Sequence, residues 1–340
     1  MNKSFPDTQP AHGLKQKWFQ VVGAAVLGCI ITGVAVAAED YPSRPIQVVV
    51  PYGQGSADAI PRLAAAVIQE AKGYNFVVEN RPGAGGLIGT QYILRQPADG
   101  YQLLMTATNN LVINQFVFAS QDLDPLKVLK PVAKLVTVPM IIAVNAKLPI
   151  NSLKELVAYQ KKGGHELYYS SPSIGTPPHI AAESFLETVK LKATHVPYKG
   201  GVAMATALAG GEVQLAVVAY ATLQSVIDGG RVRPLAVVSD ERLSTLPDVP
   251  TVTEAGYPEL LKTVLPNWWA VTVRAGTSDA IVDKIAGWME FALQNPLLQE
   301  SYRNMGMIPS YQGPKEFSES LPQEAKVWRD FVTRLNIKAD

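Results

Sequence analysis

The sequence predicts an α/β protein of two doubly wound lobes that crossover strands join. Short apolar runs alternate along the chain with segments whose apolar residues recur at helical spacing, a pattern typical of strands and helices in parallel sheets. The long extended segment 132–144, interrupted by Pro139, suits a strand that leaves one lobe and enters the next, and 268–273 would cross back. The roughly 300 residues that follow residues 1–37 also favour two domains over one.

The first lobe begins with the nearly continuous apolar run 46–50, which suits a strand buried on both faces. A helix is expected over 59–70, because its apolar residues fall at helical spacing. The alternation continues with a strand at 76–78, a helix at 88–94 and a strand at 102–106.

The second lobe repeats this alternation, and Asn151 or Ser152 would cap its first helix. The crossings place the first lobe at 38–140 plus 262–340 and the second lobe at 141–261. The remaining helices are expected at 153–160, 180–189, 202–209, 223–227, 278–293 and from 314 onward, and the remaining strands at 167–170, 193–196, 213–218 and 234–238.

The N-terminal residues 1–37 have the pattern of a secretory signal peptide. Two lysines precede the apolar stretch 18–36, which ends in the small-x-small site Ala-Val-Ala at 35–37. A transmembrane anchor is the alternative, but the glycines in the stretch make it a weak one. The only cysteine, Cys29, lies in a loose lipoprotein box, so acylation there is a minor alternative. Cleavage after 37 predicts a mature chain without disulfides or cysteine metal sites.

Charged residues of both signs are spread along the chain without a basic stripe. The chain has 30 Lys and Arg and 29 Asp and Glu, for a net charge of +1. Removal of residues 1–37 takes away three lysines and one aspartate and leaves −1. Nucleic-acid binding, which needs a basic surface for the phosphates, is therefore not expected.

The segment 79–90, Glu-Asn-Arg-Pro-Gly-Ala-Gly-Gly-Leu-Ile-Gly-Thr, is the most informative part of the chain. Gly83, Gly85 and Gly86 can adopt positive φ and direct N–H groups into one concavity before a helix, which suits an anionic oxygen. Ile88 stands where a dinucleotide fingerprint needs glycine, and no P-loop motif occurs. The loop predicts a carboxylate site, with a purely structural tight loop as the alternative.

Several blocks in a fixed order resemble one family of receptors. They are 79–86, Ala-Asp-Gly-Tyr at 98–101, His-Val-Pro-Tyr-Lys-Gly-Gly at 195–201, Leu-Pro-Asp-Val-Pro-Thr-Val at 246–252 and Glu-Ala-Gly at 254–256. From about Tyr41 to the C-terminus the chain resembles the substrate-binding proteins of tripartite tricarboxylate transporters, the Bug-type periplasmic receptors. The resemblance implies a type II periplasmic-binding-protein clamshell, a periplasmic location, and a permease of one large and one small integral membrane subunit as partner.

Loops at the expected carboxyl ends of strands would form the ligand site, because ligands of open α/β sheets bind there. The candidates are Tyr52, Gly53, Gly55, Ser56 and Asp58 after the first strand, Asn80, Gly83, Gly85 and Gly86 after the second, Thr108 and Asn109 after the third, and Ser171, Ser173, Gly175, Thr176, Lys199, Gly200 and Tyr220 in the second lobe.

Several of these residues have a structural alternative. Asp58 can simply cap a helix, Lys199 can be a solvated surface lysine, and Arg81 is expected to pair with Glu79 rather than with a ligand. Relative to the family pattern, the first loop has Ser56 in place of a glycine and is one residue shorter, which leaves its donor geometry open.

The ligand is expected to be an aromatic or hydrophobic acid. The family often carries an acidic residue where this chain has Val-Ala-Tyr at 218–220, so the site should be less polar. Tyr220 would be placed to stack on a flat ligand.

An enzyme is the main alternative function. The Gly-x-Ser-x-Gly motif is absent, and His165, His179 and His195 lack metal-type partners in their spacing. We therefore expect a monomeric receptor for a small organic acid without catalytic residues, metal or cofactor. A role in sensing rather than transport is a second alternative.

Overall fold

The computed structural model describes residues 41–338 except 54–55, 118–122 and 163–165. Tyr41–Asp340 form one compact unit. The predicted signal peptide and the predicted site residue Gly55 lie outside the described residues, as does His165. Within the described part of the chain, no helix has the length and apolar character needed to cross a membrane.

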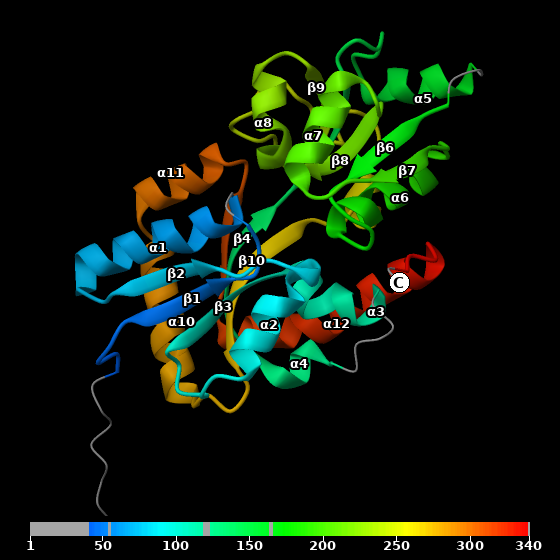
Figure 1. The fold of residues 1–340 in the computed structure, drawn as a ribbon. Coiled ribbons are helices and arrows are strands. Elements are labelled where there is room, and N and C mark those ends of the chain that lie inside the picture. Colours follow the sequence, from blue (N-terminus) through cyan, green and yellow to red (C-terminus); the bar gives the residue numbers. More distant parts are fainter. Residues whose placement is uncertain (1–40, 54–55, 118–122, 163–165, 339–340) are drawn as a thin grey trace, which may run out of the picture. The chain divides into compact units, whose positions relative to one another are not determined.

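The first sheet has six strands in the order β11-β4-β10-β3-β1-β2 (Figure 1). β1 pairs in parallel with β2 and β3, whereas β10 runs antiparallel to β3 and β4. The strands are β1 (Ile46–Val50), β2 (Phe76–Asn80), β3 (Gln102–Ala107), β4 (Leu129–Val138), β10 (Asn267–Arg274) and β11 (Ile308–Gln312).

Helices cover both faces of this sheet, because successive residues of its buried strands point to opposite faces. Val48 of β1 packs in a cluster with α1 and α10, and Val49 packs in another with α12. The helices on this part of the chain are α1 (Ser56–Lys72), η1 (Ala84–Gly86), α2 (Leu87–Leu94), the π-helix η2 (Asn109–Ile113), α3 (Asn114–Val117), α4 (Pro125–Val128), α10 (Asp279–Leu293), α11 (Pro296–Asn304) and α12 (Pro314–Arg334).

The second sheet has five strands in the order β7-β6-β8-β5-β9. The strands are β5 (Met140–Asn145), β6 (Tyr168–Ser171), β7 (Thr194–Pro197), β8 (Leu215–Ala219) and β9 (Val232–Val238). One face packs against α6 and α9 and the other against α7 and α8. The helices are α5 (Leu153–Lys161), α6 (Pro177–Val189), α7 (Gly201–Gly210), α8 (Tyr220–Asp228) and α9 (Leu260–Thr263), and Ser152 caps α5 as one of the two expected residues.

The predicted fold class is confirmed, but the expectation of purely parallel sheets is wrong. β5 begins at the carboxyl end of β8, where Met140 pairs with Ala219, and β10 begins at the carboxyl end of β4, where Asn267 pairs with Val138. A strand that enters a sheet at the edge where its neighbours end must run antiparallel to them. β5 and β10 are the strands at which the chain enters one sheet from the other. They run antiparallel to their neighbours, so both sheets are mixed.

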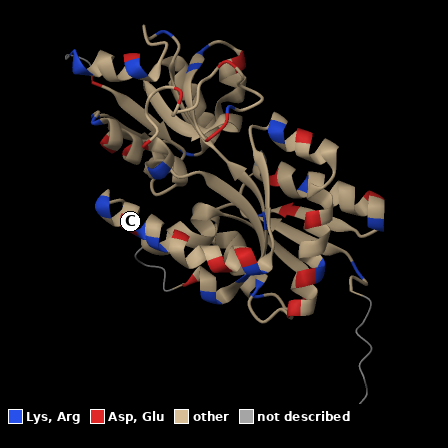
Figure 2. Ribbon diagram, turned by 180° about the vertical axis from the view of Figure 1, so that it is seen from behind, with Lys and Arg blue, Asp and Glu red and all other residues tan. Residues whose placement is uncertain are grey.

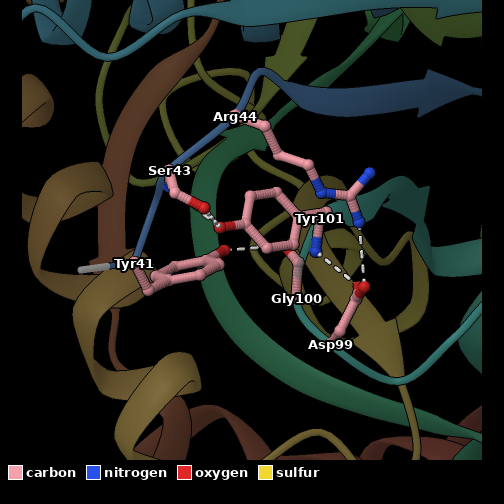
Figure 3. Close-up of polar contacts among 6 residues, drawn as sticks. All are labelled: Tyr41, Ser43, Arg44, Asp99, Gly100 and Tyr101. Atoms are coloured by element: carbon pink, nitrogen blue, oxygen red, sulfur yellow. Dashed lines mark hydrogen bonds and ion pairs between the residues drawn. The ribbon is translucent and has the colours of Figure 1, made fainter. Parts of the chain in front are cut away.

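The Ala-Asp-Gly-Tyr block at 98–101 contacts Tyr41 and Arg44, at the start of the part of the chain that the structure describes (Figure 3). The Tyr41 hydroxyl donates to the Gly100 carbonyl oxygen at 2.7 Å, and Arg44 pairs with Asp99 at 2.9 Å while its guanidinium lies over the Tyr101 ring. Gly100 has φ +81°, and a Cβ there would lie 2.9 Å from the Tyr41 hydroxyl. This motif is thus explained by packing at the start of the fold.

Candidate functional site

A cavity of about 250 Å³ lies where the chain crosses between the two sheets. Val138 and Met140, the residues on either side of the crossing from β4 to β5, line it together with Trp269 of β10. Trp269 and the preceding Trp268 point to opposite faces of β10, and Trp268 packs on Phe317 of α12. The cavity thus takes its wall from both sheets.

Four helices present their first turns to this cavity. Ala57 of α1, Pro177 of α6, Gly201 of α7 and Ala221 of α8 all line it. The first N–H groups of a helix have no intrahelical acceptor and lie at the positive end of its dipole. Neither α7 nor α8 has a side-chain hydrogen bond to its N-terminus, whereas α6 begins with two prolines that have no N–H. Among α6, α7 and α8, backbone donors for an anion therefore come chiefly from α7 and α8.

The wall itself is uncharged and mostly apolar. None of the described lining residues is charged, and the apolar ones include Met140, Val218, Trp269 and Met307. Figure 2 shows the charged residues mainly on helices and loops, with the strands of both sheets mostly tan. The polar lining side chains are Tyr52, Asn109, Thr176, Thr222 and Asn267.

Tyr52 and Asn109, both expected site residues, form one hydrogen-bonded corner of the cavity. The Tyr52 hydroxyl donates to Asn109 Oδ1 at 2.8 Å and also contacts Asn110 Oδ1. Its ring packs edge-on against Trp269, with 5.2 Å between centroids. Burial raises the pKa of Tyr52, so its hydroxyl stays protonated. The asparagines begin the π-helix η2, a type of helical irregularity that is frequent at functional sites.

The glycines of 83–86 have the positive φ values that the sequence suggested, but they do not line the cavity. Gly83, Gly85 and Gly86 have φ of +133°, +61° and +94°. The Gly85 carbonyl oxygen accepts hydrogen bonds from Asn109 and Asn110, at 3.1 and 3.0 Å, and from a third asparagine of the same segment. The Gly86 N–H donates to the Gly83 carbonyl. Direct contact of this loop with a ligand stays a prediction.

Asp58 and Asn80 hold the loop that bears Tyr52. Asn80 Nδ2 donates to the Tyr52 carbonyl oxygen at 3.0 Å, and Arg62 joins Asn80 Oδ1 to Asp58 Oδ2 at 3.2 and 3.0 Å. Neither residue lines the cavity. The expected pairing of Arg81 with Glu79, by contrast, is confirmed at 2.7 Å.

In the second sheet, the expected residues after β6 form a tight loop. Ser171 Oγ and Thr176 Oγ1 both donate to the Ser173 carbonyl oxygen, at 2.9 and 2.8 Å, and the Gly175 N–H donates to His179 Nδ1 at 3.0 Å. Of these residues only Thr176 lines the cavity. Gly175 has φ +73°, as a left-handed turn requires.

A pair of stacked histidines supports this loop. The rings of His179 and His195 lie 3.9 Å apart at 13°, and Ser171 Oγ is 2.7 Å from His195 Nε2. Burial, reinforced by His195, lowers the pKa of His179 to about 3, and burial lowers the pKa of His195 to about 4. Both imidazoles are neutral at neutral pH.

The other expected site residues lie away from the cavity wall. Lys199 is exposed, and Gly200 caps α7 with φ +99°. Thr108 is buried and accepts a hydrogen bond from the Trp268 N–H at 3.1 Å. Tyr220 is buried in the core of the second sheet, so stacking on a ligand finds no support in its position.

Two further expected residues belong to the first loop. Gly53 is exposed and does not line the cavity, and Ser56 is the first residue of α1. Thr222 and Asn267 were not expected from the sequence. The only signal for Asn267 was a polar residue two positions before Trp269 at the start of a strand.

Comparison with known proteins agrees with the resemblance found in the sequence. A family model described as the tripartite tricarboxylate transporter family receptor, TctC, matches residues 60–337. The chain is 32% identical to BugT of Bordetella pertussis over 320 residues, which cover 92% of this chain and 97% of that protein.

Solved structures give the same result. A protein of R. palustris, determined with adipate, is 29% identical with a TM-score of 0.80, over 88% of this chain and 99% of that one. The periplasmic binding protein BugD is 28% identical with a TM-score of 0.76, over 88% and 100%. The chain belongs to the tripartite tricarboxylate transporter receptor family, a family of periplasmic solute-binding proteins.

Proposed function

We propose that this protein is a periplasmic receptor that binds a small carboxylate with an apolar body in the cavity between its sheets. It would present the ligand to a permease of one large and one small integral membrane subunit. The observation that carries the proposal is the uncharged, largely apolar wall onto which the uncapped N-termini of α7 and α8 open. Such termini favour anions, and a wall without carboxylates does not repel them.

The apolar residues of the wall suit the body of the ligand. Trp269, Met140 and Met307 offer ring and thioether surface to an aromatic or aliphatic chain. The relative from R. palustris was determined with adipate, whose two carboxylates flank four methylenes. Among the residues expected from the sequence, we propose Tyr52, Asn109 and Thr176 as ligand contacts.

We propose that the two sheets with their helices are the two lobes, 38–140 plus 262–340 and 141–261. Both crossings, at Pro139 and before Asn267, lie next to the cavity and would act as hinges. Closure of the lobes would exclude water from the ligand and strengthen each hydrogen bond to it. Export by cleavage after residue 37 and action as a monomer belong to the same proposal.

The geometry of Ser171 supports a receptor over a serine hydrolase. Ser171 has one hydroxyl proton, and the Ser173 carbonyl oxygen accepts it at 2.9 Å. His195 Nε2 must then carry its own proton and donate to Ser171 Oγ. A nucleophilic serine needs the reverse arrangement, in which an unprotonated imidazole nitrogen takes the serine proton.

The test compares matched acids and amides by thermal unfolding. Adipate and benzoate are expected to raise the melting temperature by about 5 °C at 100 times their dissociation constant, while adipamide and benzamide leave it unchanged. NMR of the recovered acid should show it unaltered. A panel of organic acids that leaves the melting temperature unchanged, or a recovered acid that has been converted, would contradict the proposal.

A further inference from the structure

Three of the five polar side chains on the cavity wall already donate hydrogen bonds within the protein. The Tyr52 hydroxyl donates to Asn109, and Asn109 Nδ2 donates to the Gly85 carbonyl oxygen. Thr176 Oγ1 donates to the Ser173 carbonyl oxygen. These groups hold loops in place: the hydroxyl protons of Tyr52 and Thr176 are used within the protein, and Asn109 keeps one of its two Nδ2 protons.

The other two polar side chains on the wall are those of Asn267 and Thr222. Among the residues that the structure describes, neither side chain forms a hydrogen bond, and Asn267 Oδ1 is buried without a partner. Unpaired amides on buried surfaces are rare, because a polar group removed from water without a partner is unfavourable. Both residues line the cavity, so a ligand bound there lies beside both side chains.

The two residues belong to different sheets. Asn267 is the first residue of β10 and faces the same side of the strand as Trp269. Thr222 is the third residue of α8, and a Cβ on Gly201 would lie 2.8 Å from its Cγ2. The first turns of α7 and α8 therefore adjoin at Thr222, so that their free N–H groups and the Thr222 hydroxyl gather in one place.

We propose that Thr222 and Asn267 determine the ligand specificity of this cavity. Thr222, with the N–H groups of α8, binds the carboxylate, and Asn267 binds a second polar group of the same ligand. The inference rests on the proposed function and narrows it to acids with a second oxygen or nitrogen function, such as hydroxy acids and dicarboxylates. A plain fatty or aromatic acid would leave the Asn267 amide unpaired in a closed cavity, and such mismatches discriminate strongly.

Calorimetry with adipate, 6-hydroxyhexanoate and hexanoate, and with 4-hydroxybenzoate and benzoate, tests this assignment. The wild-type protein should bind hexanoate and benzoate about 10-fold more weakly than their substituted counterparts. Asn267→Leu should remove that difference within each series. Thr222→Val should weaken every acid about 10-fold and preserve the difference. Thr206→Val, on the exposed side of α7 outside the cavity, is the matched control and should change nothing.

A second variant, Asn267→Asp, distinguishes ligands whose second polar group is a carboxylate from ligands in which it is a hydroxyl. It also tests the assignment if Asn267→Leu does not fold. A carboxylate at 267 repels the second carboxylate of adipate but still accepts a hydrogen bond from 6-hydroxyhexanoate, so only adipate should lose affinity. Equal affinity for substituted and plain acids in the wild type, or an undiminished preference in Asn267→Leu, overturns the inference and leaves the receptor proposal standing. Failure of every acid to bind the wild type overturns both.

Discussion

The glycine loop 83–89 and the first turn of α8, 219–222, both lie near the cavity, yet only the second forms part of its wall. The glycine loop has the sequence of an anion site, and three of its glycines have positive φ. The turn of α8, Ala-Tyr-Ala-Thr, has no glycine and no sequence signal for a ligand. The comparison separates the residues that make a loop possible from the residues that line the cavity.

Packing requires glycine at two positions of the loop 83–89. A Cβ on Gly86 would lie 1.9 Å from Asn110 Nδ2, and a Cβ on Gly89 would lie 2.7 Å from Pro51 Cβ. The loop is pressed against the asparagines of η2 and the end of β1. Two of these asparagine side chains donate hydrogen bonds to the Gly85 carbonyl oxygen.

The first turn of α8 needs no special backbone. The helix follows β8 directly, Ala219 provides no capping side chain, and two small residues leave room beside the N–H groups. A helix terminus of this kind becomes an anion site only through its position in the fold. The structure places this terminus on the cavity wall, and no local pattern in the sequence predicts that position.

The largest expected effect tests the packing role of the glycine loop. Gly86→Ala introduces a Cβ against Asn110 at φ +94° and should lower the free energy of unfolding by about 3 kcal/mol. Gly287→Ala is the matched control, since a Cβ on this exposed glycine within α10 would meet nothing within 4 Å and should add about 0.5–1 kcal/mol of stability. Urea unfolding of both variants measures the difference. An unchanged stability in Gly86→Ala would contradict the packing account.

The next effect tests the role of α8. Ala221→Asp places a carboxylate at the second residue of the helix, where it should stabilise the fold by about 0.5 kcal/mol through the helix dipole and weaken acid binding about 30-fold. Val202→Asp makes the same change at the second residue of α7, whose side chain is 83% exposed. It should give the same stability and retain affinity, because solvent and salt screen its charge. Equal weakening in both variants would place the carboxylate away from α8.

Local patterns along the sequence predicted most elements of the fold. The apolar run of β1 was expected at its observed bounds, and the extended segment around Pro139 was correctly read as a crossing. β11 was missed because Pro309 and the polar residues around it lack a strand pattern, and α11 was missed because its sequence is largely polar.

The candidate site was harder to predict, because its wall depends on contacts distant in sequence. Tyr52, Asn109 and Thr176 were found because each lies in a polar loop at the end of a strand. Asn267 faces the cavity only because β10 returns beside β4, a pairing that no local pattern encodes. Tyr220 was proposed as a ligand contact because it is a polar aromatic residue at a strand end, whereas in the structure it packs in the core of the second sheet against Gly306.

The third test separates the two regions by pH. The loop 83–89 is held by amides that do not titrate, whereas the loop 171–176 is held by His195 and His179, whose pKa values in the folded state are about 4 and 3. The unfolded chain, with ordinary histidine pKa values near 6.5, binds protons first as the pH falls. Stability from this pair is therefore complete above pH 6.5 and is lost progressively down to about pH 4 to 3.

Between pH 7 and pH 5 the free energy of unfolding should decrease by about 2 kcal/mol because of His179 and by a smaller amount because of the more exposed His195. The variant with both His179→Gln and His195→Gln should lack most of this decrease. Hydrogen exchange at pH 5 should show faster exchange of the Gly175 N–H, which His179 Nδ1 accepts, while the Gly86 N–H keeps its protection. Equal loss of protection at both amides would mean that acid destabilises the whole molecule. The two loops would then respond to pH in the same way, contrary to what their hydrogen-bond partners predict.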